Sequence, residues 1–144
     1  MLFIHNYYNM GAGGVRNEVE QLADQKLKQC LRLMRIAGKR LSDLQSPVMS
    51  GMPRSSSYSN KAEDQIVNRL DAESELQEIL RAISWLKTDE RHLLIDRYFD
   101  VEEPNDIMVA YSMNLDERQY YRLKNKALRE FAESYMNGSL FQNA

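Results

Sequence analysis

The sequence predicts an all-α protein in which a long N-terminal helical hairpin precedes a C-terminal helix-turn-helix domain. Apolar residues recur every three or four positions through most of the chain, which is the period of an amphipathic helix. No stretch shows the alternation of apolar and polar residues that a half-buried β-strand needs. Residues that cap helices precede several of the periodic stretches. Together these three observations favour helices throughout.

Length and composition predict a compact soluble protein. The chain has 144 residues, of which 43% are hydrophobic and 28% are charged, enough for one core and one or two small modules. No run approaches the roughly 18 apolar residues of a membrane span, and Met1 to Ile4 is too short for a secretory signal. We therefore expect a cytoplasmic protein with no membrane contact. The single cysteine, Cys30, lies on an apolar stripe and is expected in the core.

Changes in composition divide the chain into four parts. Residues 1–14 end in a glycine-rich run and are expected to form a flexible N-terminal arm. Residues 15–87 are expected to form long oligomerising helices, separated by a linker at 45–60 that is rich in serine and contains two prolines. Residues 88–137 are expected to form the helix-turn-helix DNA-binding domain, and residues 138–144 a flexible tail.

The two long helices are expected to pair with each other. The first stripe runs over about thirty residues and comprises Val15, Val19, Leu22, Cys30, Met34, Ala37, Leu41 and Leu44. It is interrupted at Lys26, where the neighbouring Leu27 can fill the gap. The second comprises Ala62, Ile66, Leu70, Leu76, Leu80, Ile83 and Leu86. Val15–Leu44 carries seven basic and four acidic residues, whereas Lys61–Glu103 carries six basic and twelve acidic ones, so the segments attract each other. This favours an antiparallel hairpin within one chain or an exchange of helices in a homodimer.

The C-terminal part has the features of a helix-turn-helix. Thr88 is expected to cap one helix, after which a short helix runs from about Asp106 to Met113. Asn114 tolerates the left-handed backbone of a sharp turn, and Asp116 can cap a further helix that begins at Glu117. This last helix is expected to extend to about Met136.

The last long helix combines an apolar stripe with a basic outer face. Its stripe comprises Tyr120, Leu123, Ala127, Phe131 and Tyr135, while Arg118, Gln119, Arg122, Lys124, Asn125, Lys126 and Arg129 are expected mostly outside it. Arg118 to Arg129 holds five cations and no anion, although the whole chain has a net charge of −2. A buried stripe backed by side chains that reach phosphates and base edges suits the reading of double-stranded DNA.

Two segments of this C-terminal part resemble the fourth conserved region of bacterial sigma factors, which reads the upstream promoter element. They are residues 90–99 and residues 116–128. Ser46-Pro47, Gly51-Met52-Pro53, Asn60 and Glu63-Asp64, together with this sigma-like end, more narrowly resemble the ArpU family of phage transcriptional regulators. The resemblance covers about Ser46 to Tyr135. It implies a phage or prophage protein in a bacterial host cell that regulates late genes, such as those for packaging or lysis.

The resemblance also implies roles for single residues. Glu117, Arg118, Tyr121 and Arg122 occupy the positions that face the major groove, and Lys124, Asn125, Lys126 and Arg129 those near the DNA backbone. Arg118 or Arg122 would then offer paired donors to guanine, while Lys124, Lys126 and Arg129 meet phosphates. The family's glycine at the turn is replaced by Asn114, and the two aromatic residues at 120 and 121 replace aliphatic and polar ones.

The sequence leaves two other functions open, a small terminase and a helical adaptor. A small terminase also joins a helix-turn-helix to long oligomerising helices, but it forms a ring and marks DNA for packaging. A helical adaptor with no nucleic-acid role would show no affinity for DNA. In an activator, the acidic surface between Glu63 and Glu103 would contact RNA polymerase.

The sequence predicts no enzyme, no metal and no cofactor. It has only two histidines and one cysteine, and it lacks both metal-ligand spacing and a phosphate-binding loop.

Overall fold

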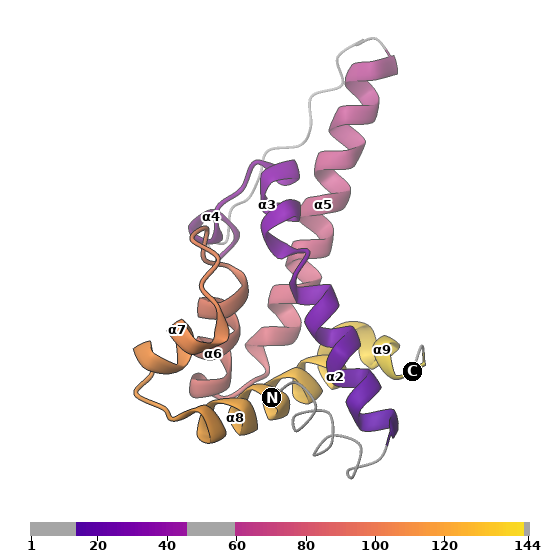
Figure 1. The fold of residues 1–144 in the computed structure, drawn as a ribbon. Coiled ribbons are helices and arrows are strands. Elements are labelled where there is room, and N and C mark those ends of the chain that lie inside the picture. Colours follow the sequence, from indigo (N-terminus) through magenta and orange to yellow (C-terminus); the bar gives the residue numbers. More distant parts are fainter. Residues whose placement is uncertain (1–13, 46–59, 143–144) are drawn as a thin grey trace.

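The computed structural model describes residues 14–45 and 60–142, which are helical with no β-strand among them (Figure 1). The predicted all-α class is confirmed. Residues 1–13 of the expected arm and residues 46–59 of the expected linker lie outside the described residues.

The N-terminal segment forms three helices where the sequence predicted one. They are α2 (Gly14–Leu27), α3 (Cys30–Ala37) and α4 (Leu41–Gln45). A turn at Lys28-Gln29 separates α2 from α3, so that α2 packs against the C-terminal helix α8 (Glu117–Ser134) while α3 packs against α5 (Asn60–Ser84). Tertiary packing therefore breaks the continuous helix, because a straight helix could not follow both partners.

Gly38 produces the second break in this segment. Its φ of 67° is left-handed, and its N–H donates to the carbonyl of Arg35, while the N–H of Lys39 donates to the carbonyl of Met34. These two bonds form a Schellman motif, in which glycine is favoured because it lacks a Cβ. The helix α3 therefore ends at Ala37.

Helix α5 forms the expected antiparallel pair with the N-terminal segment, through α3 (Figure 1). Near the end of α2, Lys26 Nζ lies 2.9 Å from Glu75 Oε1 of α5. This ion pair connects the basic N-terminal segment to the acidic segment that contains α5. Only the second half of α5 is in the core. Ile66, Val67 and Leu70 of its first half, which extends beyond the body in Figure 1, are exposed, although the sequence placed Ile66 and Leu70 on a buried stripe.

The C-terminal part contains the predicted pair of helices around a turn, with small shifts at the ends. Its remaining elements are α6 (Thr88–Tyr98), α7 (Asp106–Ser112), the 3-10 helix η1 (Tyr135–Asn137) and α9 (Ser139–Gln142). Thr88 is the first residue of α6, and the capping position belongs to Lys87. The long helix α8 ends at Ser134, because left-handed residues follow at Met136 and Asn137. Residues 139–142, assigned to a flexible tail, form α9 with Leu140 buried.

One hydrophobic core connects the N-terminal and C-terminal helices. Its largest fully buried side chains include Leu27 of α2, Leu76 of α5, Leu93 of α6, and Tyr120 and Phe131 of α8. Cys30 is also fully buried, as predicted, and burial raises the pKa of its thiol to about 12. Helix α8 therefore rests on a body built from both ends of the chain.

Candidate nucleic-acid interface

The turn between α7 and α8 has the left-handed residue and the N-cap that the sequence predicted, and α7 starts with a cap that it did not. Asn105 Oδ1 accepts a hydrogen bond from the Met108 N–H at 2.9 Å at the start of α7, and Asn114 has a left-handed φ of 58°. Asp116 Oδ1 accepts from the Gln119 N–H at 2.7 Å, and Gln119 Oε1 accepts in return from the Asp116 N–H at 3.1 Å. This reciprocal capping box begins α8 at Glu117, the predicted residue.

A partly buried ionic cluster sets how α7 lies against α8. Asp106 Oδ1 accepts hydrogen bonds from Arg97 Nε at 3.0 Å, Tyr120 Oη at 2.7 Å and Lys124 Nζ at 2.9 Å. Burial by itself raises the pKa of Asp106, but the Tyr120 hydrogen bond and the Lys124 charge outweigh burial and lower that pKa. One carboxylate therefore joins α6, α7 and α8 and stays ionised at neutral pH.

Lys124 does not lie on the outer face that the sequence assigned to it. The residue is only 8% exposed, and both oxygens of Asp106 accept hydrogen bonds from its ammonium group. It follows Tyr120 by four residues and precedes Ala127 by three, which puts it on the buried side of α8. That spacing was visible in the sequence, whereas the pairing with Asp106, eighteen residues away, was not.

Lys126 and Arg129 also face the body of the protein. Lys126 Nζ lies 3.3 Å from Oε1 of the buried Glu90, and Arg129 Nε lies 3.5 Å from Glu20 Oε1 on α2. Lys126 keeps about half of its side chain exposed, whereas Arg129 is 29% exposed. Asn125, between them, is half-buried. Of the predicted contacts with the DNA backbone, Lys126 therefore pairs with α6 and Arg129 with α2.

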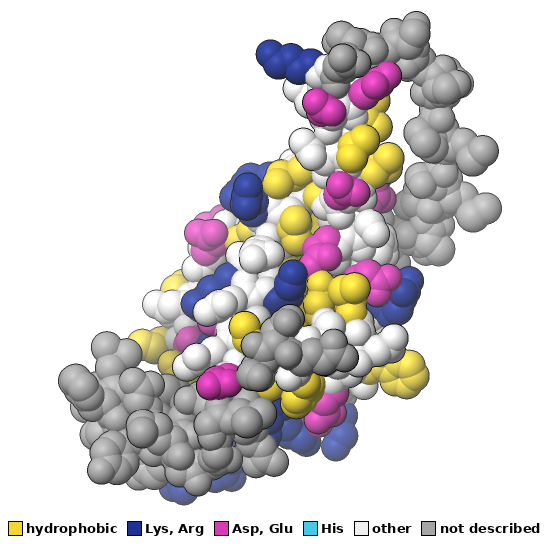
Figure 2. Space-filling model, turned by 90° about the vertical axis from the view of Figure 1, so that its right-hand side faces the viewer, with side chains coloured by type: hydrophobic (Ala, Val, Ile, Leu, Met, Phe, Trp, Pro, Cys, Tyr) yellow, Lys and Arg dark blue, Asp and Glu magenta, His cyan; other side chains and the backbone are white. Residues whose placement is uncertain are grey.

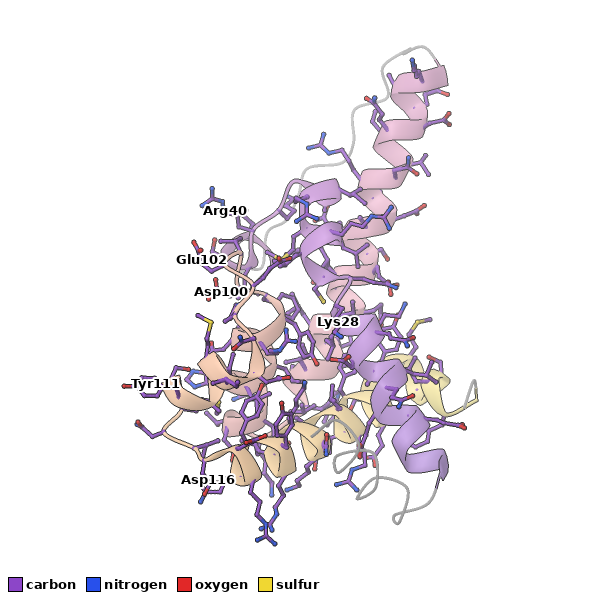
Figure 3. The ribbon with its side chains drawn as sticks, in the orientation of Figure 1. Lys28, Arg40, Asp100, Glu102, Tyr111 and Asp116 are labelled. Atoms are coloured by element: carbon purple, nitrogen blue, oxygen red, sulfur yellow. The ribbon has the colours of Figure 1, made fainter. Side chains whose placement is uncertain are left out.

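The remaining predicted residues form an exposed surface on the first turns of α8, which we name the α8 face. It comprises Glu117, Arg118, Gln119, Tyr121 and Arg122. All except the half-buried Tyr121 are exposed, and Arg118 and Arg122 lie one helical turn apart. Neither arginine has an ion pair or hydrogen bond with the described residues. In Figure 3 the surface begins beside the labelled Asp116, at the lower end of the molecule.

Sequence reasoning missed Asp106, Glu90 and Glu20 as determinants of this surface. Each is an acid on another helix and forms an ion pair with a cation of α8. The three acids together therefore determine which cations of α8 are available to bind a ligand. Only Asp106 had a local signal, as the first residue of the helix that precedes the turn. The described residues contain no group of histidines, cysteines and carboxylates that could hold a metal ion.

The fold and this surface define a small helical protein that presents the capped start of α8 to its surroundings. The two arginines there have no ion pair within residues 14–45 and 60–142. No model of a known protein family matches the chain, and no solved structure matches it. Two relatives do, and each carries the provisional name autolysin regulatory protein ArpU. That from Enterococcus hirae is 35% identical over 114 residues, covering 79% of this chain and 83% of the relative. That from Streptococcus phage O1205 is 31% identical over 117 residues, covering 80% and 85%. The chain belongs to the ArpU family.

None of the helices formed by the described residues has the length and apolar character required to cross a lipid bilayer.

Proposed function

We propose that this protein is a sequence-specific DNA-binding transcriptional regulator and that the α8 face reads the DNA. The observation that carries the proposal is the placement of Arg118 and Arg122. Both are exposed and unpaired among the described residues, on a helix whose start is fixed by a capping box. Guanidinium groups held in this way can donate two hydrogen bonds to guanine O6 and N7.

In the proposed complex, the helix-turn-helix of α7 and α8 inserts the start of α8 into the major groove. Glu117, Gln119 and Tyr121 then lie within reach of base edges or the thymine methyl group. Three of the predicted phosphate contacts form ion pairs within the protein, namely Lys124, Lys126 and Arg129. They therefore contribute only part of the contact with DNA phosphates that the sequence predicted. Specificity thus depends on the first two turns of α8, and its last two turns mainly anchor the helix.

The names of the relatives support a regulatory role and point to a class of target gene. Their names refer to the regulation of an autolysin, and one of them is encoded by a phage. We therefore propose that the protein acts in the cytoplasm of a bacterial host and activates late phage genes, those for lysis or packaging, through a sigma-like domain. The proposal includes no catalysis and no cofactor. A homodimer is part of it, because a single helix-turn-helix contacts few base pairs.

The direct test is a fluorescence-anisotropy titration of the full chain against duplexes from upstream of the lysis and packaging genes and against scrambled duplexes. The Arg122→Ala variant should lose about 1 to 3 kcal/mol on the specific duplex and much less on the scrambled one. Arg81→Ala, an exposed arginine on α5, is the matched control and should bind like the wild type. Equal losses on both duplexes would refute base reading, and a wild type without salt-dependent affinity would refute any role with DNA.

A further inference from the structure

A second cationic segment, residues 28–40, has no role in the proposed reading of DNA by α8. It holds five cations and no acidic residue, which is the same excess of positive charge as in residues 118–129. It lies on α3 and the turns on either side of that helix. The segment is therefore a second candidate surface for an anionic ligand.

The cations at the two ends of this segment have acidic neighbours, and those between them do not. Lys28 Nζ lies 3.0 Å from Asp24 Oδ2. Arg40 stands beside Asp100 and Glu102 in Figure 3. The cations that have neither an ion pair nor a side-chain hydrogen bond with the described residues are Arg32, Arg35 and Lys39. The acidic helix α5 therefore does not neutralise them.

The packing of α3 on α5 turns the arginines outward. The buried side of α3 comprises Cys30, Met34 and Ala37. Arg32 and Arg35 lie one turn apart on the opposite side of the helix, and both are exposed. Like charges at this spacing repel each other, so an anion bound between them would be stabilised.

A fourth cation comes from α5. Arg69 is exposed and approaches the end of α3, where its Nη2 would lie 3.2 Å from a Cβ at Gly38. It also has no ion pair with the described residues. We name the surface formed by Arg32, Arg35, Lys39 and Arg69 the α3 basic face.

The composition of the α3 basic face favours phosphate groups as its ligand. Of the outward-facing residues of α3, only Ile36 is apolar, and it is 37% exposed. The face therefore lacks the apolar centre of a protein interface and the apolar side of a membrane-bound helix. Guanidinium groups match phosphate oxygens with paired hydrogen bonds, and duplex DNA carries a negative charge about every 1.7 Å.

The α3 basic face and the α8 face lie on different parts of the molecule. In Figure 1, α8 lies at the lower end and α3 in the upper half, with α2 between them. Helix α2 has 14 residues and is about 21 Å long, and it packs on α8 and leads into α3. A duplex read by the first turns of α8 therefore leaves the α3 basic face open.

Given the proposed function, we propose that the α3 basic face binds the phosphates of a second DNA segment, so that the protein bridges two duplexes. Contacts with phosphates alone carry no sequence preference, so the second segment can have any sequence. Such contacts are weak, with typical dissociation constants of about 10⁻⁴ to 10⁻⁶ M at physiological salt. Two segments of one DNA molecule would be bridged more readily, because the link between them raises their effective concentration.

A capture assay tests the bridge. The specific duplex is immobilised on beads, the full-length protein is added, and the capture of a labelled scrambled duplex from solution is measured at about 50 mM salt, where phosphate contacts are strong. The double variant Arg32→Ala/Arg35→Ala should bind the immobilised duplex within about twofold of the wild type and capture at least about fivefold less of the second duplex.

Two further variants separate charge at this face from charge elsewhere. Arg32→Lys/Arg35→Lys keeps the positive charges and should capture at least about half as much as the wild type. Lys61→Ala/Arg81→Ala removes two exposed cations of α5 and is the matched control. It should equal the wild type in both measurements.

Each alternative role of the α3 basic face gives a different result, and each overturns the proposal. A parallel loss of binding to the immobilised duplex would place Arg32 and Arg35 in the specific complex. A fall in mass by light scattering would make the face a contact with the acidic α5 of a second copy. Capture that is lost in Val67→Ser/Leu70→Ser but kept in the alanine variant of α3 would come from two α8 faces of a dimer.

Unchanged capture by the alanine variant of α3 also overturns the proposal, as does a wild type that binds the immobilised duplex and captures no second one. A wild type that does not bind the immobilised duplex would instead refute the proposed function, and with it a bridge through α8.

Discussion

Asp106 joins three helices beside the proposed DNA-binding surface. It is a carboxylate at the start of a short helix, and it accepts hydrogen bonds from two cations and a tyrosine on two other helices. A partly buried carboxylate with three such donors stabilises the fold only while all its partners are present. Removing it would leave Arg97 and Lys124 close together without a counter-charge.

We expect Asp106→Asn to lower the free energy of unfolding by about 2 to 3 kcal/mol at pH 7, since the two cations lose their partner. Urea denaturation monitored by circular dichroism measures this difference. Asp71→Asn, an exposed acid on α5 with no ion pair among the described residues, is the control and should change stability by less than about 0.5 kcal/mol.

The same carboxylate predicts a dependence on pH. The pKa of Asp106 is lowered in the folded protein, so its stabilising effect is complete above the unfolded pKa of about 4 and is lost as the pH falls through the folded value. The gap between wild type and Asp106→Asn should therefore narrow when unfolding is measured below pH 4. A gap of equal size at pH 7 and pH 2.5 would contradict the charge-based account.

The turn between α7 and α8 is the part of the fold that the sequence predicted best. Asn114 and Asp116 lie where they were expected, because a left-handed turn and an N-cap depend on residues within one helical turn. The break at Lys28-Gln29 has no such local signal, since neither glycine nor proline is present and the packing of α2 and α3 on different helices produces it. The burial of Lys124 depended likewise on a distant acid. Local chemistry thus predicted the exposed arginines, and long-range pairing decided which other cations remain available.

The capping box of α8 gives a prediction for this element. Asp116→Ala removes the acceptor for the Gln119 N–H and should destabilise the protein by about 1 kcal/mol. Because the first turn of α8 is the proposed reading surface, fraying there should also weaken binding to the specific duplex. Thermal unfolding and the anisotropy titration measure the two effects, with Asp116→Asn as the control that keeps a capping oxygen. Equal behaviour of the alanine and asparagine variants would argue against the cap.

Gly38 gives a second prediction for an element, the end of α3. Gly38→Ala forces a side chain into a φ of 67° and should cost about 1 kcal/mol. Its new Cβ would lie 3.2 Å from Arg69 Nη2, the end of a flexible side chain that can move away. Gly138→Ala, with a φ of 81° and no contact closer than 3.8 Å, is the control for strain without crowding. If the two variants lose similar amounts of unfolding free energy, the cost comes from the backbone conformation. A much larger loss for Gly38→Ala would show that the new Cβ is crowded by Arg69.

At the scale of the whole molecule, the N-terminal helix α2 and the C-terminal helices form one body. Helix α2 packs across α8, where Glu20 meets Arg129, and the hydroxyl of Tyr135 donates to Glu75 of α5. The helices expected to serve oligomerisation therefore also support α8, the helix proposed to read DNA. What they leave free for a second copy is the first half of α5, whose hydrophobic side chains are visible near the top of Figure 2.

This exposed half of α5 is the surface through which we expect the homodimer to form. Ile66, Val67 and Leu70 are 36%, 53% and 48% exposed on a helical segment that extends past α3. So small an apolar area supports only a weak dimer, with a dissociation constant on the order of micromolar, which two adjacent DNA half-sites would strengthen.

Light scattering from low to high protein concentration should show a change from monomer to dimer, and the double variant Val67→Ser/Leu70→Ser should remain monomeric. Val101→Ser, a control at an even more exposed apolar residue elsewhere, should dimerise like the wild type. A concentration-independent monomer both alone and on DNA would refute the dimer, whereas a ring of many subunits would favour a packaging component of the small-terminase type.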